Sequence, residues 1–463
     1  MSWVPPKFVK EWELTNLDTT LSHHIISLTA TKNGLFVLVR EEGETYTPPS
    51  KWDKLSEGER QSEISTMKLM FGRILSEEER LADKGGLFSK KTAIVHYRVQ
   101  QYSIDGRFIR QWPEASLQIS SEMRKKTPSI LIRKGNGEKE IESTLELVTP
   151  ENITSDIAGN IYVVDYQGNK LIKFNDCGKV VNMWAISGEK PLGGYYDTLG
   201  YHHGLSIWED KLYLVSTELA MSPSAAASPF IPRIAAYDVD GILISDQKLD
   251  VSLVSMEHSI DKKSAGVAMA EENIQSLAIG KEGNLFLLIG DTTIVKLDKT
   301  FRKTGQFQAI LRTGLDRPKP VYDPTTKKTI NYEEIVLKGT GIPFNRFSSD
   351  KLAWSGNPLG LYNASKISIS PNGELYVTFT GSKAFGTIDA LVISNSGQML
   401  GYWKRAKKSH SKWFNELTDL EKLETTDDDL DIAFYGNKVF IGRTLQEGGS
   451  KRRYHAVIQE FVR

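Results

Sequence analysis

Apolar and polar residues alternate along much of the chain, a pattern that predicts β-strands rather than helices. Asn-Gly, Asp-Gly and Gly-Asn pairs separate the alternating stretches, as in β-hairpins. Residues 153–184 hold the clearest unit, which has four short strands and ends on a tryptophan. Similar units occur at residues 277–308 and 367–403, and weaker ones at residues 205–249 and 25–112. A four-stranded motif is therefore predicted to repeat along the chain.

The last unit lacks its fourth strand. Residues 436–463 contain the preceding strands of the motif, and the sequence then stops. Residues 7–12 (Lys-Phe-Val-Lys-Glu-Trp) resemble the fourth strand of the first unit, residues 107–112 (Arg-Phe-Ile-Arg-Gln-Trp). We therefore predict an all-β, six-bladed β-propeller in which the N-terminal strand completes the last blade. Such closure removes the open sheet edges that otherwise promote aggregation.

The repeat predicts a single domain over residues 1–463. Its expected parts are a closing strand at 1–14, blades at 24–112, 145–186, 201–250, 270–310, 364–404 and 420–463, and a long connector at 311–363. The connector is rich in aromatic residues, which favours an ordered lid or rim on the propeller.

Residues 43–91 interrupt the first blade with a segment that we predict to be helical. Two pairs have the spacing of capping boxes: Ser56 with Glu59, and Ser76 with Glu79. Four apolar residues share one face of the expected helix: Ile64, Met67, Phe71 and Ile74. Two interpretations stay open, since this face either packs against the side of the propeller or belongs to an arm that binds a partner.

Charge and cysteine content narrow the range of partners. The chain has 58 basic and 58 acidic residues, and this balance argues against a nucleic-acid binder, which typically has a basic face. Its single cysteine, Cys177, excludes an internal disulfide framework and a CxxC metal site. The sequence shows no signal peptide and no membrane span, so a cytoplasmic location is expected.

Residues 153–184 resemble the NHL repeat of six-bladed propellers. The resemblance is carried by Asp156, the run Gly159-Asn160-Ile161-Tyr162-Val163, Asp165, and Ile172-Lys173-Phe174. It implies a propeller for the whole chain and leaves several roles open, namely protein docking, RNA binding or, in related six-bladed families, metal-dependent lactone hydrolysis. Glu11 and Asn152 have residue types used by the lactonases, but no surrounding motif supports the match.

Alignment of the repeats predicts a polar ring at one mouth of the central channel. Equivalent positions before the innermost strands hold Ser27, Asn152, Gly204, Ser276, Lys366 and Asp431, with Glu151, His203, Gln275 and Ser365 one position earlier. The candidate ligand-binding residues are Glu151, Asn152, His203, Gln275, Lys366 and Asp431. Such a ring holds either a small polar ligand, a divalent cation on Glu151 and Asp431, or ordered water. No other cofactor is predicted.

The sequence favours a non-enzymatic binding or scaffold protein that presents one propeller face and its insertions to a protein partner. A metal-dependent hydrolase or lyase with its site at the channel mouth is the first alternative. RNA binding through the basic residues 404–414 is the second, and it is disfavoured by the acidic residues that follow. The pairs His23-His24 and His202-His203 lack the spacing of a zinc site.

Overall fold

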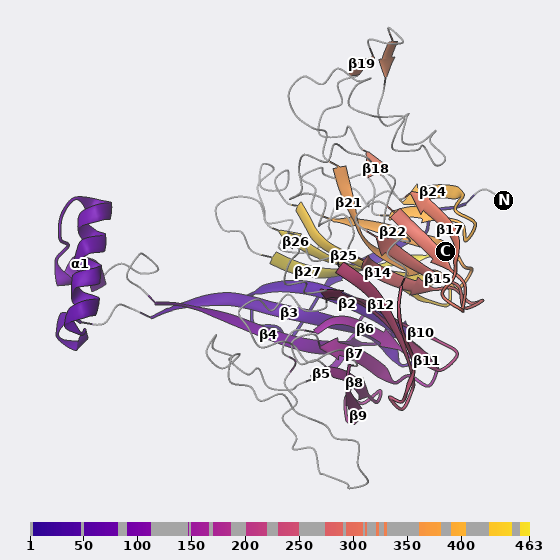
Figure 1. The fold of residues 1–463 in the computed structure, drawn as a ribbon, viewed down its shortest axis with the longest axis horizontal. Helices are drawn as coiled ribbons and strands as arrows, with labels where there is room; N and C mark the ends of the chain where they lie inside the picture. Colours follow the sequence, from indigo (N-terminus) through magenta and orange to yellow (C-terminus); the bar gives the residue numbers. More distant parts are fainter. Residues whose placement is uncertain are drawn as a thin grey trace.

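The computed structural model shows strands arranged in blades around a central axis (Figure 1). It describes residues 3–47, 51–81, 90–112, 147, 150–165, 170–186, 201–219, 230–249, 274–289, 293–308, 311–312, 321–323, 328–330, 361–380, 390–403, 426–446 and 454–463. In this part of the chain, no helix is long and apolar enough to cross a membrane.

The first three blades are four-stranded antiparallel sheets with their strands in sequence order. Blade 1 contains β2 (Ser22–Thr31), β3 (Gly34–Thr47), β4 (Lys90–Tyr102) and β5 (Phe108–Trp112). Blade 2 contains β6 (Pro150–Ser155), β7 (Ile161–Asp165), β8 (Lys170–Phe174) and β9 (Val180–Ala185). Blade 3 contains β10 (Tyr201–Trp208), β11 (Lys211–Leu219), β12 (Phe230–Asp238) and β13 (Leu243–Lys248).

The other three blades complete the ring. Blade 4 contains β14 (Ile274–Ile279), β15 (Leu285–Ile289), β16 (Thr293–Leu297) and β17 (Lys303–Gln308). Blade 5 contains β21 (Leu361–Ile369), β22 (Leu375–Thr380), β23 (Ala390–Ile393) and β24 (Met399–Trp403), with β18 (Leu311–Arg312) paired to β21. Blade 6 contains β25 (Thr426–Tyr435), β26 (Lys438–Gln446), β27 (Tyr454–Val462) and β1 (Lys7–Glu13). A separate hairpin pairs β19 (Val321–Asp323) with β20 (Lys328–Ile330).

The first strand of each blade lies nearest the axis, and consecutive first strands contact one another in the closed order β2, β6, β10, β14, β21, β25 and β2. The prediction of an all-β, six-bladed propeller is therefore confirmed. The N-terminal strand β1 pairs with β27, bringing Phe8 opposite Phe461 and Trp12 opposite Ile458. The predicted closure of the last blade by the N-terminal strand is also confirmed.

The hydrophobic core consists of six layers, each between two neighbouring blades. Alternate residues of one strand serve different layers: Val37 of β3 packs toward blade 6, whereas Leu38 packs toward blade 2. Both faces of a blade are therefore covered, which explains why second strands such as β7 and β15 are buried at every position.

Aromatic residues join neighbouring blades at the turn between the third and fourth strands. In four blades this turn carries a glycine, and an aromatic ring from the fourth strand of the preceding blade lies against it. The pairs are Trp12 with Gly106, Trp112 with Gly178, Trp184 with Gly241, and Phe307 with Gly397. The aromatic residue that ends the predicted four-stranded unit thus packs on the next blade.

The insertion in blade 1 forms a projecting arm, which we define as residues 43–94. Strands β3 and β4 stay paired as far as Thr47 and Lys90, so both ends of the segment predicted to be helical are strand. Beyond them lie η1 (Trp52–Lys54), α1 (Glu57–Phe71) and α2 (Glu77–Leu81). Figure 1 shows α1 beyond the far end of the β3–β4 ribbon, apart from the blades. In the structure, α1 therefore projects away from the propeller and does not pack against its side.

Two other sequence features fall outside the described residues. The basic stretch at residues 404–414 is one of them, so the RNA-binding alternative stays a prediction. Most of the connector at residues 311–363 is the other, and only its short strands β18, β19 and β20 and the start of β21 are described.

Candidate functional site

The first strand of five blades carries a β-bulge at the position that the sequence alignment singled out. The extra residue of each bulge is Ile26, Glu151, His203, Gln275 or Ser365. In blade 6 the bulge lies earlier, between Asp427 and Asp429, and Asp431 is paired directly opposite Gly442. A bulge leaves its extra residue without a regular ladder partner and changes the direction of nearby side chains.

The channel holds a cavity of about 420 Å³ that is lined by the first strands of all six blades. Three predicted site residues line it: Asn152, Lys366 and Asp431. Glu151 and Gln275 are described but do not line this cavity, and the side chain of His203 lies outside the described structure. The predicted carboxylate pair of Glu151 and Asp431 is therefore not brought together on the cavity wall.

Asp431 is buried and holds blade 6 against blade 1. Its Oδ2 accepts hydrogen bonds from the Ser27 hydroxyl at 2.8 Å and from the Leu28 amide at 3.0 Å. Its Oδ1 accepts from its neighbour, the Ile432 amide, at 2.8 Å. Ser276 has the equivalent role between blades 4 and 5, because its Oγ accepts from the Ile367 amide at 3.1 Å. A residue at this ring position thus connects its blade to the next one.

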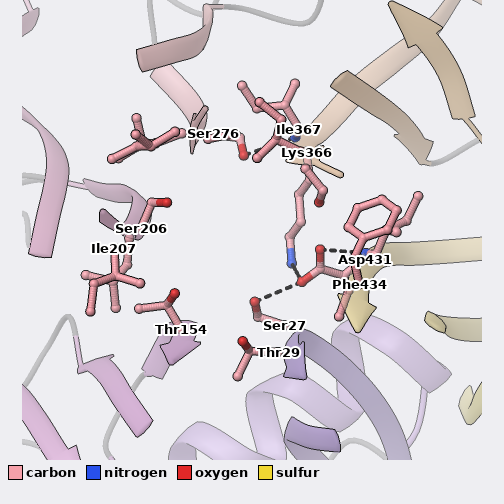
Figure 2. Close-up of a pocket in the computed structure, with 18 of the residues that line it drawn as sticks. Ser27, Thr29, Thr154, Ser206, Ile207, Ser276, Lys366, Ile367, Asp431 and Phe434 are labelled. Carbon is pink, nitrogen blue, oxygen red and sulfur yellow. Dashed lines mark hydrogen bonds and ion pairs between the residues drawn. The ribbon is translucent and has the colours of Figure 1, made fainter. Parts of the chain in front are cut away.

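Lys366 extends this connection to a third blade. Its Nζ lies 3.3 Å from Oδ2 of Asp431 and donates a hydrogen bond to the Ile26 carbonyl of blade 1. Ile26 is the extra residue of the β2 bulge, and a bulge disrupts the ladder around the extra residue. We call Ile26, Ser27, Lys366 and Asp431 the latch network. Figure 2 shows Lys366, Asp431 and Ser27 together on one wall of the cavity.

A second polar ring lies two residues further along the first strands and was not predicted. Its hydroxyl groups come from Thr29, Thr154, Ser206 and Ser368, all of which line the cavity. In Figure 2, Thr154 and Ser206 lie across the open centre from Lys366. The period of two along a strand was the available signal, because residues two apart face the same side.

Histidines 23 and 24 lie at the base of the arm, outside the channel. The His23 Nε2 donates to the Asp18 carbonyl at 2.8 Å, and burial lowers the pKa of His23 below its ordinary value of 6.5. The His24 Nε2 lies 2.9 Å from Oε1 of Glu42, and this hydrogen bond lowers the pKa of Glu42. These histidines therefore tie β2 to its surroundings through defined hydrogen bonds.

The described residues of the cavity wall offer hydrogen-bonding groups. Among the described residues, no group of three or more His, Cys, Asp or Glu side chains is placed to hold a metal ion. The carboxylate of Asp431 is already occupied by hydrogen bonds and by Lys366. The hydroxyl groups on the opposite wall can donate and accept hydrogen bonds.

Comparisons with known proteins assign no family to the chain. No family model and no curated protein matches the chain. A streptogramin B lyase structure is 10% identical over 98% of both chains, with a TM-score of 0.37. A Dyadobacter fermentans protein of unknown function is 9% identical over 99% of both chains, with a TM-score of 0.41. The structure of YCF48 bound to a D1 peptide is 10% identical over 99% of this chain and 100% of the other, with a TM-score of 0.33.

These likenesses carry no argument about function. The six-bladed fold rests on the order and pairing of the strands themselves. A propeller fold by itself does not specify a function.

Proposed function

We propose that this chain is a non-enzymatic binding protein that docks a protein partner through the tip of its arm, residues 51–81. The observation that carries the proposal is an exposed apolar patch on the tip, formed by Leu69, Met70, Phe71 and Ile74. Their exposed fractions are 84%, 59%, 50% and 49%. Apolar groups that lie together at a surface mark interaction sites more often than scattered single residues do.

The tip has its own stabilising contacts, so the apolar patch is not needed to hold it together. Arg80 is fully buried, lies 2.8 Å from the Glu63 carboxylate and stacks on Trp52 at 5.0 Å. Met67 is also buried, and its sulfur accepts a hydrogen bond from the Leu75 amide. Because Arg80, Glu63, Trp52 and Met67 already order the tip, the exposed side chains remain available for a partner.

Helix capping fixes the backbone on both sides of the patch. The predicted capping box of Ser56 and Glu59 is present at the start of α1. Ser76 and Glu79 exchange the equivalent hydrogen bonds at the start of α2. Gly72 ends α1 in the left-handed conformation and turns the chain directly after Phe71. A surface held in this way loses little conformational entropy on binding.

The docking function is tested with a double substitution in the patch, Leu69→Ser with Phe71→Ser. The matched control replaces two exposed isoleucines of blade 3, Ile242→Ser with Ile244→Ser, whose exposed fractions are 56% and 50%. Each immobilised chain captures proteins from an extract of the source cells for quantitative mass spectrometry. A captured protein is then purified and titrated by calorimetry.

The expected result is a partner that binds the intact chain and the blade 3 control equally. The tip variant should bind it more weakly by at least about tenfold, because removal of a central apolar anchor weakens an interface strongly. Equal binding by all three chains would rule out the patch as the docking surface. Circular dichroism of each variant checks that α1 is still folded.

We further propose that the propeller is of the NHL type. The support comes from Asp156, whose Oδ1 accepts hydrogen bonds from the Gly159 and Asn160 amides, both at 2.8 Å. Its Oδ2 accepts from the Asn160 side chain at 2.7 Å and from the Tyr162 hydroxyl at 3.0 Å. The motif residues of blade 2 thus form one hydrogen-bonded turn. Asp156→Ala should lower the thermal midpoint and leave partner binding unchanged.

A further inference from the structure

The channel cavity is chemically divided into two walls. The latch network occupies one wall, and its own polar groups are engaged in hydrogen bonds between blades 1, 5 and 6. The facing wall belongs to blades 2 and 3 and carries Asn152, Thr154 and Ser206. At about 420 Å³ the cavity lies within the range of small-molecule sites, roughly 300 to 1,000 Å³.

We call Asn152, Thr154 and Ser206 the open arc. Within the part of the chain that the structure describes, their side chains make no hydrogen bond and no ion pair. Each one is partly buried and lines the cavity. This contrasts with Thr29 of the same ring, whose hydroxyl lies 2.8 Å from the Ser155 hydroxyl. The open arc therefore has unused donors and acceptors on the cavity wall, and Figure 2 shows Thr154 and Ser206 beside the open centre of the channel.

Charge restricts the class of ligand that fits. Lys366 and Asp431 are the oppositely charged pair on the latch wall, and together they contribute no net charge. The other charged residue of the lining, Lys281, is exposed. A phosphate group placed against this pair would meet the buried Asp431 carboxylate, and a free cation would meet the Lys366 ammonium. A neutral ligand with several hydroxyl groups avoids both repulsions. Its hydroxyls can donate to and accept from the open arc.

The other end of the cavity offers apolar surface. Trp208 and Phe434 belong to its lining, and Trp208 is held in place by a hydrogen bond from its Nε1 to the Lys281 carbonyl at 3.2 Å. An aromatic side chain beside hydrogen-bonding groups matches a ligand that has both C–H faces and hydroxyl edges. A pyranose ring combines these two features in a molecule of suitable size.

We propose that the channel binds a neutral monosaccharide in pyranose form, with hydroxyl groups hydrogen-bonded to Asn152, Thr154 and Ser206. The sugar would lie between the open arc and the latch wall. This binding site is separate from the apolar patch of the arm, so it adds a small-molecule function to the proposed protein docking.

The test uses the full chain and three named sugars, D-glucose, D-galactose and D-mannose, in ligand-observed NMR and calorimetric titration. The informative variant is Thr154→Val with Ser206→Ala, which removes two hydroxyl groups from the open arc. The control is Thr66→Val on α1, which makes the threonine-to-valine change outside the channel. Thermal unfolding shows whether each variant keeps the stability of the parent chain.

At least one sugar should bind the parent chain and the Thr66→Val control equally. The channel variant should bind it more weakly by about tenfold, since the two lost hydrogen bonds between neutral groups together correspond to a change of that size. The proposal is overturned if none of the three sugars binds the parent chain. Stronger binding of glucose 6-phosphate than of glucose would also overturn it, because the site would then select an anion. If Asn152→Ala and the channel variant both retain full affinity, the sugar binds elsewhere and the assignment is wrong.

Discussion

Single residues at the turn between the third and fourth strands of a blade show how closely neighbouring blades pack. Four blades place a glycine where the ring of the preceding blade packs, but blade 4 places Phe301 there. Phe301 has a positive φ of 64°, and its ring lies 6.4 Å from that of Tyr213 in blade 3. The fourth strand of blade 3, β13, contains no aromatic residue. The turn of blade 4 therefore supplies the ring that blade 3 lacks.

This arrangement predicts different results for two glycines with similar backbone conformations. Gly241 and Gly373 have φ values of 86° and 82°, but only Gly241 would place a Cβ against Trp184, at 2.5 Å. Gly373→Ala should destabilise the fold by about 1 kcal/mol through backbone strain alone. Gly241→Ala should destabilise it by about 1 to 3 kcal/mol more, because the added methyl displaces the ring. Urea unfolding of both variants measures the difference, and equal losses would show that the ring contact does not matter.

His23 makes stability depend on pH. Because burial lowers the pKa of His23 below 6.5, the folded state binds its proton more weakly than the unfolded state does. Stability should therefore be full above about pH 6.5 and fall as the pH drops toward the lowered pKa. Urea midpoints between about pH 7.5 and about pH 5 should show this loss, and His23→Gln should reduce the slope. An unchanged slope in the variant would assign the pH dependence to other groups.

At the scale of elements, the closing strand is the part of the propeller with the most distant partners. Glu11 of β1 accepts a hydrogen bond from Gln459 at 2.5 Å, and Gln459 accepts one from the buried Arg443. Phe8 packs edge to face on Phe461, at a centroid distance of 5.6 Å. The strand thus joins blade 6 through both hydrogen bonds and ring contacts.

Removal of residues 1–13 should open the ring at blade 6. The loss of Phe8 and Trp12 alone should destabilise the fold by about 3 kcal/mol, because both are partly buried apolar side chains. Differential scanning calorimetry of the truncated chain measures this loss. A synthetic peptide of residues 3–14 should raise the midpoint again, whereas a peptide with Phe8→Ser and Trp12→Ser should not. A truncated chain with the parent midpoint would contradict the closing role of β1.

The sequence predicted strands better than it predicted the arm and the channel. Alternation and turn residues are local, so they located the blades and the residues aligned with Asn152, Lys366 and Asp431. The helical face was only partly right, because α1 ends at Phe71 and Ile74 lies beyond it. Met67 is buried within the tip, whereas Phe71 and Ile74 are exposed. Which side chains are already hydrogen-bonded depends on contacts between blades, and no local pattern contains that information.

At the scale of the whole molecule, the latch network and the closing strand act on the same part of the ring. Lys366 and Asp431 connect blades 5, 6 and 1 at the channel, and β1 completes blade 6. Thr154 and Ser206 of the open arc lie across the channel from this region (Figure 2). Among the described residues of the cavity lining, the contacts of the latch network thus lie where the chain closes, and the open arc lies on the facing wall.

The pairing of β1 with β27 also has a consequence for how the protein is made. Glu11 and Gln459 are separated by 448 positions, so β1 leaves the ribosome long before β27, the strand with which it pairs. At ordinary rates of translation the wait is about 20 to 90 s. During this interval Phe8 and Trp12 are exposed on an unpaired strand, where a chaperone can bind them. Faster synthesis of the last blade would shorten the period in which the nascent chain is vulnerable to aggregation.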